Sequence, residues 1–289
     1  MVKNKVLSIA GSDSSGGAGI QADLKTFQEL NVYGMTALTT IVTMDPKNNW
    51  EHRTFPQEII TVKEQLRTII EGIGINALKT GMLGSVQLIE LVSQVIDQYQ
   101  LDNIVIDPVL ICKGVTEVMY PETVDSLQDL LIPKATIVTP NLLEAAHLSN
   151  MAPIKSIEGM KKAAKIIYDL GPKYVLVKGG SRIKHETALD LLYDGEHFNY
   201  IQSERFQTNH IHGAGCTYSA AIAAELAKGQ SVINAVRIAK LFITEAIRSS
   251  FALNQYAGST NHSAYKETTN LLEGTVKNEE FKRKRLSGS

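Results

Sequence analysis

The sequence has little cysteine. Its 289 residues include two, Cys112 and Cys216, which lie in unrelated segments without metal-ligand or redox-motif spacing. This usage argues against a disulfide framework, because small disulfide-rich folds carry many cysteines at regular spacings. We therefore expect both residues to be reduced thiols and the protein to be cytoplasmic.

An excess of one charge and long apolar runs are also lacking. Lys and Arg number 29 against 30 Asp and Glu, so the net charge of −1 offers nothing to attract nucleic acid or a membrane surface. The first apolar run, residues 6–10, is too short for a signal sequence. No stretch approaches the roughly 18 apolar residues that a membrane helix needs. We expect a small-molecule substrate and no nucleic-acid or membrane partner.

What the sequence does have is an alternation of short β-rich runs with stretches of helical periodicity, in a chain with 44% hydrophobic residues. This alternation predicts an α/β fold, a three-layer αβα sandwich with a mainly parallel central sheet. The predicted strands cover residues 5–11, 35–43, 77–83, 103–109, 136–139 and 174–178. The predicted helices cover residues 19–30, 58–71, 86–99, 122–131, 156–170, 214–228 and 232–249.

Two segments interrupt the alternation. Residues 45–56 are polar and rich in turn formers, which predicts a flap over a site. Residues 188–206 predict a β-hairpin around the turn at 193–196, extending the edge of the sheet. We expect one domain over residues 1–274, with the flap as its lid, and a disordered tail at 275–289.

A glycine-rich turn at residues 209–217 leads directly into an apolar helical stretch. Such a turn points unpaired backbone N–H groups at one spot, where the helix dipole adds positive potential. The turn is therefore predicted to hold a phosphate group that gains charge during transfer. Cys216 lies in the same turn, where backbone amides are expected to lower its pKa. The alternative is that Cys216 is a small buried hydrophobe at a tight turn.

A second glycine-rich turn, residues 11–19, follows the first strand and opens a helix. It superficially matches a dinucleotide-binding turn, but the next predicted strand has no acidic residue near its end until Asp45. An NAD-dependent oxidoreductase is therefore a distant alternative. The turn is either a flexible connection or a place where Asp13 hydrogen-bonds a substrate ring or hydroxyl.

Polar residues stand at the ends of three further predicted strands. Asp107 ends a hydrophobic strand, where a carboxylate costs desolvation unless something uses it. Asn141 and Glu144 either form a helix capping box or lie near Asp107, where oxygen ligands would suit Mg²⁺ with some of its waters. Lys178, before Gly179, is placed to meet nucleotide phosphates as a point charge.

Six motifs in this order resemble the ribokinase-like superfamily, and within it the branch of hydroxymethylpyrimidine kinases and related bacterial pyridoxal kinases. The resemblance spans nearly the whole chain and implies an αβα sandwich with a small lid. The motifs are Ile9-Ala10-Gly11-Ser12-Asp13, Lys79-Thr80-Gly81-Met82, Asp107-Pro108-Val109, Val138-Thr139-Pro140-Asn141 with Glu144, Val177-Lys178-Gly179-Gly180, and His212-Gly213-Ala214-Gly215-Cys216-Thr217.

The resemblance also implies a cofactor set and roles. ATP and Mg²⁺ are implied, a monovalent cation is left open, and a homodimer is implied because this branch often forms one. Cys216 stands where most ribokinase-like sugar kinases have aspartate, so it is the implied proton acceptor. The remaining implied roles are the γ-phosphoryl site at Gly213, Ala214 and Gly215, the ATP site at Asn141, Glu144, Lys178 and Gly179, and the Mg²⁺ site at Asp107 and Glu144, partly through water.

Two departures bear on the substrate. Pyrimidine kinases of this branch carry glutamine in a segment where this chain has Met44, and a cysteine at the place of Cys112 is similar to the pyridoxal kinases. Because a thiol adds reversibly to an aldehyde, Cys112 is predicted to act as a catalytic residue that forms a hemithioacetal with pyridoxal. His52 either covers the substrate ring or is a solvated loop residue. The predicted substrate site comprises Gly11, Asp13, Gly19, Met44, His52 and Cys112.

The sequence thus predicts ATP-dependent phosphorylation of the 5′-hydroxymethyl group of pyridoxal, pyridoxine or pyridoxamine. The alternative is a hydroxymethylpyrimidine or phosphomethylpyrimidine kinase of thiamine synthesis, or both activities in one protein. A non-catalytic vitamin-binding sensor is a more distant alternative, since a sensor need not keep the groups that transfer a phosphoryl.

Overall fold

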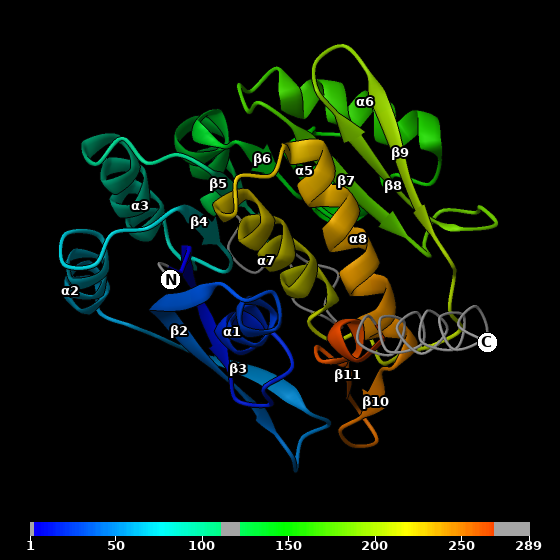
Figure 1. The fold of residues 1–289 in the computed structure, drawn as a ribbon, viewed down its shortest axis with the longest axis horizontal. Coiled ribbons are helices and arrows are strands. Elements are labelled where there is room, and N and C mark those ends of the chain that lie inside the picture. The colour runs from blue at the N-terminus through cyan, green and yellow to red at the C-terminus, as the bar shows by residue number, and fades with distance from the viewer. Residues whose placement is uncertain (1–2, 111–121, 269–289) are drawn as a thin grey trace, which may run out of the picture.

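The computed structural model describes residues 3–110 and 122–268. In that part, one nine-stranded sheet in the order β3-β2-β1-β4-β5-β6-β7-β8-β9 carries helices on both faces (Figure 1). The predicted α/β sandwich is confirmed. Cys112 and the tail predicted at 275–289 lie outside the described residues.

The strands of the large sheet and the small C-terminal hairpin have the following bounds: β1 (Lys5–Asp13), β2 (Tyr33–Asp45), β3 (Glu51–Pro56), β4 (Ala77–Thr80), β5 (Ile104–Ile106), β6 (Ile137–Val138), β7 (Val175–Gly180), β8 (Ala188–Tyr193), β9 (Phe198–Ser203), β10 (Phe251–Ala252) and β11 (Gly258–Ser259). The helices are α1 (Gly19–Glu29), α2 (Ile59–Ile70), α3 (Val86–Gln98), α4 (Thr123–Ser126), η1 (Leu127–Leu131), η2 (Ile132–Lys134), α5 (Leu142–Leu148), α6 (Ile157–Tyr168), α7 (Ala214–Ala227) and α8 (Val232–Arg248).

Side chains on successive strand residues enter two different cores, one on each face of the sheet. Val6 of β1 and Ala77 of β4 pack with α1, α7 and α8. Their neighbours Leu7 and Leu78 pack with α2, α3, α5 and α6 on the opposite face. The strands are apolar on both sides because the sheet is covered on both sides, as in other parallel α/β sheets.

The sheet is parallel from β2 through β7, and only β3, β8 and β9 run antiparallel to their neighbours. The carboxyl ends of β1, β4, β5, β6 and β7 therefore meet at one edge. Loops that follow these strands converge there, which is where open α/β sheets bind ligands. The predicted hairpin of β8 and β9 is confirmed and extends the sheet beyond β7.

The flap differs from its prediction, since half of it is a strand. β2 continues to Asp45, and Glu51–Pro56 form β3, which pairs antiparallel with it. The polar segment is a strand because the protruding end of β2 satisfies its backbone hydrogen-bonding groups. At the flap tip, Trp50 stacks on Tyr256 beside the β10–β11 hairpin, with ring centroids 6.2 Å apart.

The segment predicted as a helix over residues 122–131 is helical but is not one regular α-helix. It begins as the short α4 and then widens into the π-helical turn η1. Over residues 3–110 and 122–268, no helix combines the length and apolar character needed to cross a bilayer.

Candidate active site

A cavity of about 440 Å³ lies at the carboxyl edge of the sheet. Every site residue predicted from the sequence that falls within the described residues contributes to its lining. These residues are Gly11, Asp13, Gly19, Met44, His52, Asp107, Asn141, Glu144, Lys178, Gly179, Gly213, Ala214, Gly215 and Cys216. The topology brings them together because they follow neighbouring parallel strands or lie on the flap and the first turn of α7.

Asp107 is the centre of a buried polar network. Its Oδ1 accepts hydrogen bonds from the Lys178 ammonium at 2.8 Å and the Thr139 hydroxyl at 3.2 Å. Its Oδ2 accepts from the Ser219 hydroxyl of α7 at 3.0 Å. Asp107 is 3% exposed, so the ion pair with Lys178 compensates the charge that burial would otherwise leave unpaired. Attraction to Asp107 and Glu144 raises the pKa of Lys178 against the opposing effect of burial.

Asn141 and Glu144 form the capping box of α5. The Asn141 side chain accepts from the backbone N–H groups of Leu143 and Glu144, and Glu144 Oε2 accepts from the Asn141 N–H at 2.8 Å. The capping interpretation is thus confirmed. Both residues also line the cavity beside Lys178, so capping and ligand binding are compatible. Burial raises the pKa of Glu144 to about 8, and repulsion from Asp107 adds to the rise.

The oxygen ligands of Asp107 and Glu144 fit Mg²⁺. The two side chains are buried and repel each other when both are charged, and a divalent cation nearby would stabilise the charged form of both. Among the described residues, no group of three or more His, Cys, Asp and Glu side chains is arranged to hold a metal. Hydrogen bonds also occupy both oxygens of Asp107. The protein therefore suits a cation that keeps its waters and takes its other ligands from a substrate, as Mg²⁺ does.

The glycine-rich turn before α7 opens a helix as predicted, but the prediction that Ala214 offers a free N–H group is wrong. Gly213 is the N-cap with φ +77°, and a Cβ there would lie 1.8 Å from the carbonyl oxygen of Gly17. The N–H of Ala214 donates to the carbonyl of Ile211 at 3.1 Å, so it is already engaged. The N–H groups of Gly215 and Cys216 belong to the first helical turn, where α-helix geometry supplies no internal acceptor.

Lys178 adds a full positive charge to this turn. A Cβ on Gly215 would lie 3.5 Å from the Lys178 ammonium, so the side chain from β7 reaches the first turn of α7. Backbone donors, a helix N-terminus and an ammonium group converge on one part of the cavity. Such an arrangement binds a phosphate or another anion.

The lowered pKa expected for Cys216 is wrong for this structure. Burial raises the pKa of the thiol to about 11, an effect that the charge of Lys79 and the backbone N–H of Gly19 offset only in part. Proximity to helix amides stabilises a thiolate, but desolvation of the charge acts against it and is the larger effect here. In the free protein Cys216 is therefore a neutral thiol at neutral pH.

The Asp13 carboxylate borders the cavity and is engaged by its own loop. It accepts hydrogen bonds from the backbone N–H groups of Ser15 and Ala18, at 2.8 and 2.9 Å. It also pairs with His212 Nε2 at 2.6 Å. Hydrogen bonds to His212 and Ser15 lower the pKa of Asp13, although burial acts in the opposite direction. Sequence reasoning did not identify His212 as a site residue, although it lies in the sixth motif.

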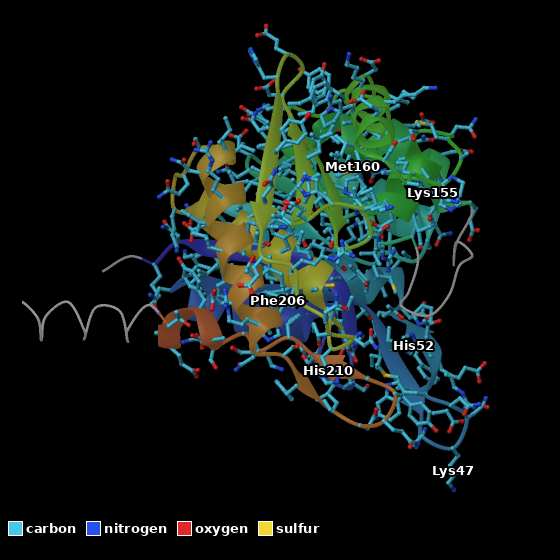
Figure 2. All side chains as sticks on the ribbon, turned by 90° about the vertical axis from the view of Figure 1, so that its right-hand side faces the viewer. Lys47, His52, Lys155, Met160, Phe206 and His210 are labelled. Atoms are coloured by element: carbon cyan, nitrogen blue, oxygen red, sulfur yellow. The ribbon has the colours of Figure 1, made fainter. Side chains whose placement is uncertain are left out.

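Met44 and His52 lie side by side in the flap, because they are register partners in the adjacent strands β2 and β3. Both line the cavity, and Figure 2 shows His52 on the flap well above its tip at Lys47. Burial lowers the pKa of His52, which favours its neutral form. The interpretation of His52 as a solvated loop residue is therefore not supported.

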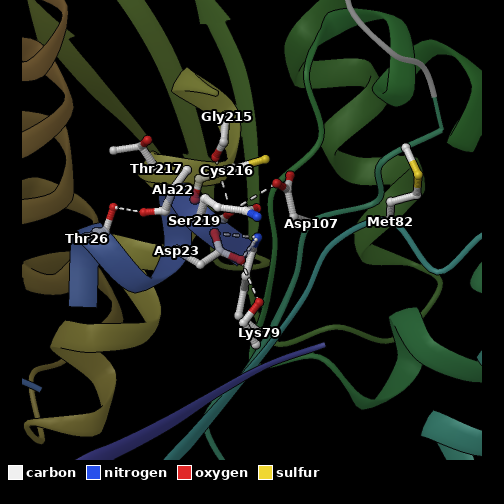
Figure 3. Close-up of polar contacts among 12 residues, drawn as sticks. Ala22, Asp23, Thr26, Lys79, Met82, Asp107, Gly215, Cys216, Thr217 and Ser219 are labelled. Carbon is white, nitrogen blue, oxygen red and sulfur yellow. Dashed lines mark hydrogen bonds and ion pairs between the residues drawn. The ribbon is translucent and has the colours of Figure 1, made fainter. Parts of the chain in front are cut away.

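Sequence reasoning also missed a buried pair, Asp23 and Lys79. Figure 3 shows it beneath Cys216 and Ser219, with Asp107 to one side. A signal for it exists in the sequence. Asp23 interrupts the apolar face of α1 next to Ala22, and Lys79 lies inside the short apolar strand β4. A charged residue at such a position is seldom buried unless it is paired.

Comparison with known proteins places this site in a family. The family model for phosphomethylpyrimidine kinase matches residues 13–261. A pyridoxine kinase of Bacillus subtilis (strain 168) is 58% identical over 264 residues, which are 91% of this chain and 97% of that protein.

Solved structures agree with this likeness. An ADP complex of Bacillus subtilis pyridoxal kinase superposes with a TM-score of 0.89 at 57% identity, covering 92% of this chain and 99% of the other. A Staphylococcus aureus pyridoxal kinase in complex with AMP-PCP and pyridoxal gives 0.87 at 45% identity, covering 92% and 96%. With its fold, its anion-binding turn and nearly its full length matched, the chain belongs to the phosphomethylpyrimidine kinase family.

Proposed function

We propose that this protein is an ATP-dependent kinase that phosphorylates the 5′-hydroxymethyl group of pyridoxal, pyridoxine and pyridoxamine. The observation that carries the proposal is the Staphylococcus aureus pyridoxal kinase in complex with AMP-PCP and pyridoxal, which this chain matches at a TM-score of 0.87. The cavity described above also supports it, because its lining includes both the anion-binding turn and the flap residues Met44 and His52.

The phosphate end of the cavity accounts for the transfer step. The Gly215 and Cys216 N–H groups and the Lys178 ammonium bind the γ-phosphoryl group and stabilise the charge that develops on its oxygens. The substrate hydroxyl attacks in line, and its proton passes to the thiolate form of Cys216, which is the minority form at neutral pH because burial raises the pKa of the thiol. Catalysis then consists mainly of positioning and electrostatic stabilisation, as in other phosphoryl transfers.

Asp107 and Glu144 are the residues that would hold Mg²⁺, partly through its waters. Mg²⁺ would neutralise negative charge on the phosphates of ATP. Asp107 also holds Lys178 in place through their 2.8 Å ion pair. Glu144 keeps the Asn141 N–H satisfied at the start of α5, so the loop after β6 stays ordered beside the phosphates.

The family model itself favours a second candidate, since its description is phosphomethylpyrimidine kinase. This alternative keeps the phosphate end and changes the ring that the flap covers. Met44 supplies a thioether to the cavity and so offers no hydrogen-bond donor for an aminopyrimidine edge. That chemistry favours the B6 vitamers, and we propose them as the principal substrates.

The deciding experiment compares kcat/KM of the purified protein for pyridoxal and for hydroxymethylpyrimidine with ATP and Mg²⁺. We expect pyridoxal to be preferred by at least tenfold. A preference for the pyrimidine would assign the alternative function. Cys216→Ala is expected to abolish ATP consumption that depends on pyridoxal, and undiminished turnover would refute the role of Cys216.

We also propose that the protein acts as a homodimer in the cytoplasm. The support is its resemblance to a branch in which dimers are common, together with the low cysteine content of the sequence, which predicts reduced thiols. Light scattering on the purified protein measures the oligomeric state directly, and a monomeric mass would refute the dimer.

A further inference from the structure

A fully buried ion pair lies under the phosphate end of the cavity. The Lys79 ammonium donates to both carboxylate oxygens of Asp23, at 2.9 and 2.8 Å, and both side chains are 0% exposed. The hydroxyl of Ser8 donates to Asp23 Oδ2 at 2.5 Å. The three residues come from β4, α1 and β1, so the pair is fixed by three elements.

Burying such a pair costs free energy, because both charges lose their hydration. A protein with apolar residues of similar volume in place of the pair is often equally stable or more stable, so packing alone does not explain why the pair is present. Lys79 nevertheless borders the catalytic cavity, and a Cβ on Gly81 would lie 3.3 Å from its ammonium nitrogen. The absence of a side chain at Gly81 leaves room for this nitrogen.

The pair lies next to the turn that carries Cys216. Helix α7 packs against both β4 and α1. Figure 3 shows Asp23 and Lys79 on one side of this turn, with Ser219 and Cys216 directly above. Attraction to Asp23, Cys216 and Asp107 raises the pKa of Lys79 above its usual range, although burial alone would lower it. Lys79 is therefore charged at any pH at which the enzyme works.

Four charged groups face Cys216 from the elements packed around it: Lys79 of β4, Asp23 of α1, Asp107 after β5 and Lys178 of β7. The two carboxylates disfavour a thiolate. Lys178 is paired with Asp107, and in the proposed function it also binds phosphate. Lys79 is the group that most strongly opposes the effect of burial on the pKa of Cys216.

We infer that Lys79 is a positioning residue for proton transfer: its ammonium, held in place by Asp23, keeps a positive charge under Cys216 that stabilises the thiolate. This inference rests on the proposed function for its catalytic consequence. In the reaction, the fraction of Cys216 that is thiolate, which the charge of Lys79 increases, takes the proton of the substrate hydroxyl and becomes a thiol. The hydroxyl oxygen forms a bond to the γ-phosphorus, and the bond from that phosphorus to the bridging oxygen breaks and releases ADP.

The inference is tested on the thiol itself, without turnover. Iodoacetamide labels the thiolate of a cysteine, and peptide mass spectrometry distinguishes Cys216 from Cys112, so the labelling rate against pH gives the pKa of Cys216. Lys79→Met removes the positive charge, and we expect labelling of Cys216 at pH 8 to slow about tenfold or more, since one pKa unit changes the thiolate fraction tenfold.

The matched variant is Asp23→Asn, which keeps the shape and removes the negative charge. Labelling of Cys216 is expected to become faster in this variant. An effect of charge changes the labelling rate in opposite directions in the two variants. A disturbed structure changes the labelling rate of both variants in the same direction. Equal rates in Lys79→Met and the unaltered protein, or changes of the same sign in the two variants, would overturn the inference.

A folding defect is controlled by the double variant Asp23→Asn with Lys79→Met, which leaves no unpaired charge. Its labelling is expected to be slower than that of the unaltered protein but faster than that of Lys79→Met, and an unaltered rate would also overturn the inference. In kinase assays the pH profile of kcat for Lys79→Met should move to higher pH. If the unaltered protein has no kinase activity but the variants show the expected changes in the labelling rate of Cys216, the proposed function is wrong and the electrostatic role of Lys79 is still supported.

Discussion

Asp13 and His212 are paired at 2.6 Å between a carboxylate oxygen and a ring nitrogen, although 199 positions separate them in the chain. The pair joins the end of β1 to the turn before α7. Packing reinforces it, because a Cβ on Gly17 would lie 2.6 Å from the His212 ring. The two glycine-rich turns are thus one unit, and each fixes the position of the other.

His212→Ala should separate these turns. We expect a loss of about 1–3 kcal/mol in the free energy of unfolding, because Asp13 loses a buried partner. The pKa of Asp13 is lowered in the folded protein, so its stabilising contribution is present above its ordinary value of 3.8 and is lost as the pH falls further. Urea denaturation at several pH values measures the free energy of unfolding of both proteins. The difference in this free energy between the variant and the unaltered protein should become smaller below about pH 3.8. A variant as stable as the unaltered protein at pH 7 would contradict this account.

Gly213→Ala should be strongly destabilising, by more than about 3 kcal/mol, because the new Cβ would overlap the carbonyl of Gly17 as well as occupy a left-handed backbone conformation. The control is Gly229→Ala, at a residue that also has positive φ but no atom within 4 Å of the added Cβ. It should cost about 1 kcal/mol, the backbone penalty alone. Denaturant midpoints measure both, and similar losses would mean that the contact with Gly17 is unimportant.

Glu144→Gln should change how stability depends on pH. The folded-state pKa of Glu144 is raised to about 8 from an ordinary 4.5, so the folded protein holds a proton that the unfolded chain releases in this window. Its contribution to stability is complete below about pH 4.5 and is lost as the pH rises to about 8. The unaltered protein should therefore lose up to a few kcal/mol relative to the variant between these limits. Thermal unfolding without added metal measures this, and parallel curves for the two proteins would refute it.

His52→Ala should weaken binding of the substrate ring without affecting the nucleotide. We expect KM for pyridoxal to rise about tenfold, the loss of one contact worth about 1.4 kcal/mol, and KM for ATP to stay within about twofold. Lys47→Ala, at the exposed tip of the same flap, is the control and should change neither value. A rise in both constants for His52→Ala would indicate a general disturbance of the flap.

Cys112→Ala tests the predicted hemithioacetal. Pyridoxal carries an aldehyde and pyridoxine does not, so the variant should lose kcat/KM selectively for pyridoxal, by about tenfold or more if the adduct contributes over about 1.4 kcal/mol. Steady-state kinetics on the two vitamers provide the measurement. An equal loss on both would show that Cys112 acts in another way.

Local patterns in the sequence are sufficient to locate the site and to predict many of its residues. Asp107, Asn141 and Lys178 each end or follow a buried strand, and parallel strands bring their carboxyl ends to one edge. The alternation of strands and helices therefore predicted that these residues lie at the same edge of the sheet, whereas their contacts with one another depended on the order of the strands. The glycine-rich start of α7 was equally visible, because a local turn followed by a helix creates an anion site whatever surrounds it.

Which charged side chains are buried together depends instead on how the whole chain packs. The Asp13–His212 and Asp23–Lys79 pairs join segments far apart in the chain, and no local pattern specifies such partners. The pKa of Cys216 shows the consequence: its position on a helix predicts a lowered value, whereas burial raises it to about 11. The effect of backbone amides on a pKa acts over one helical turn and can be read from the local sequence. Desolvation and ion pairing depend on every element packed around the group, and that packing exists only once the chain has folded.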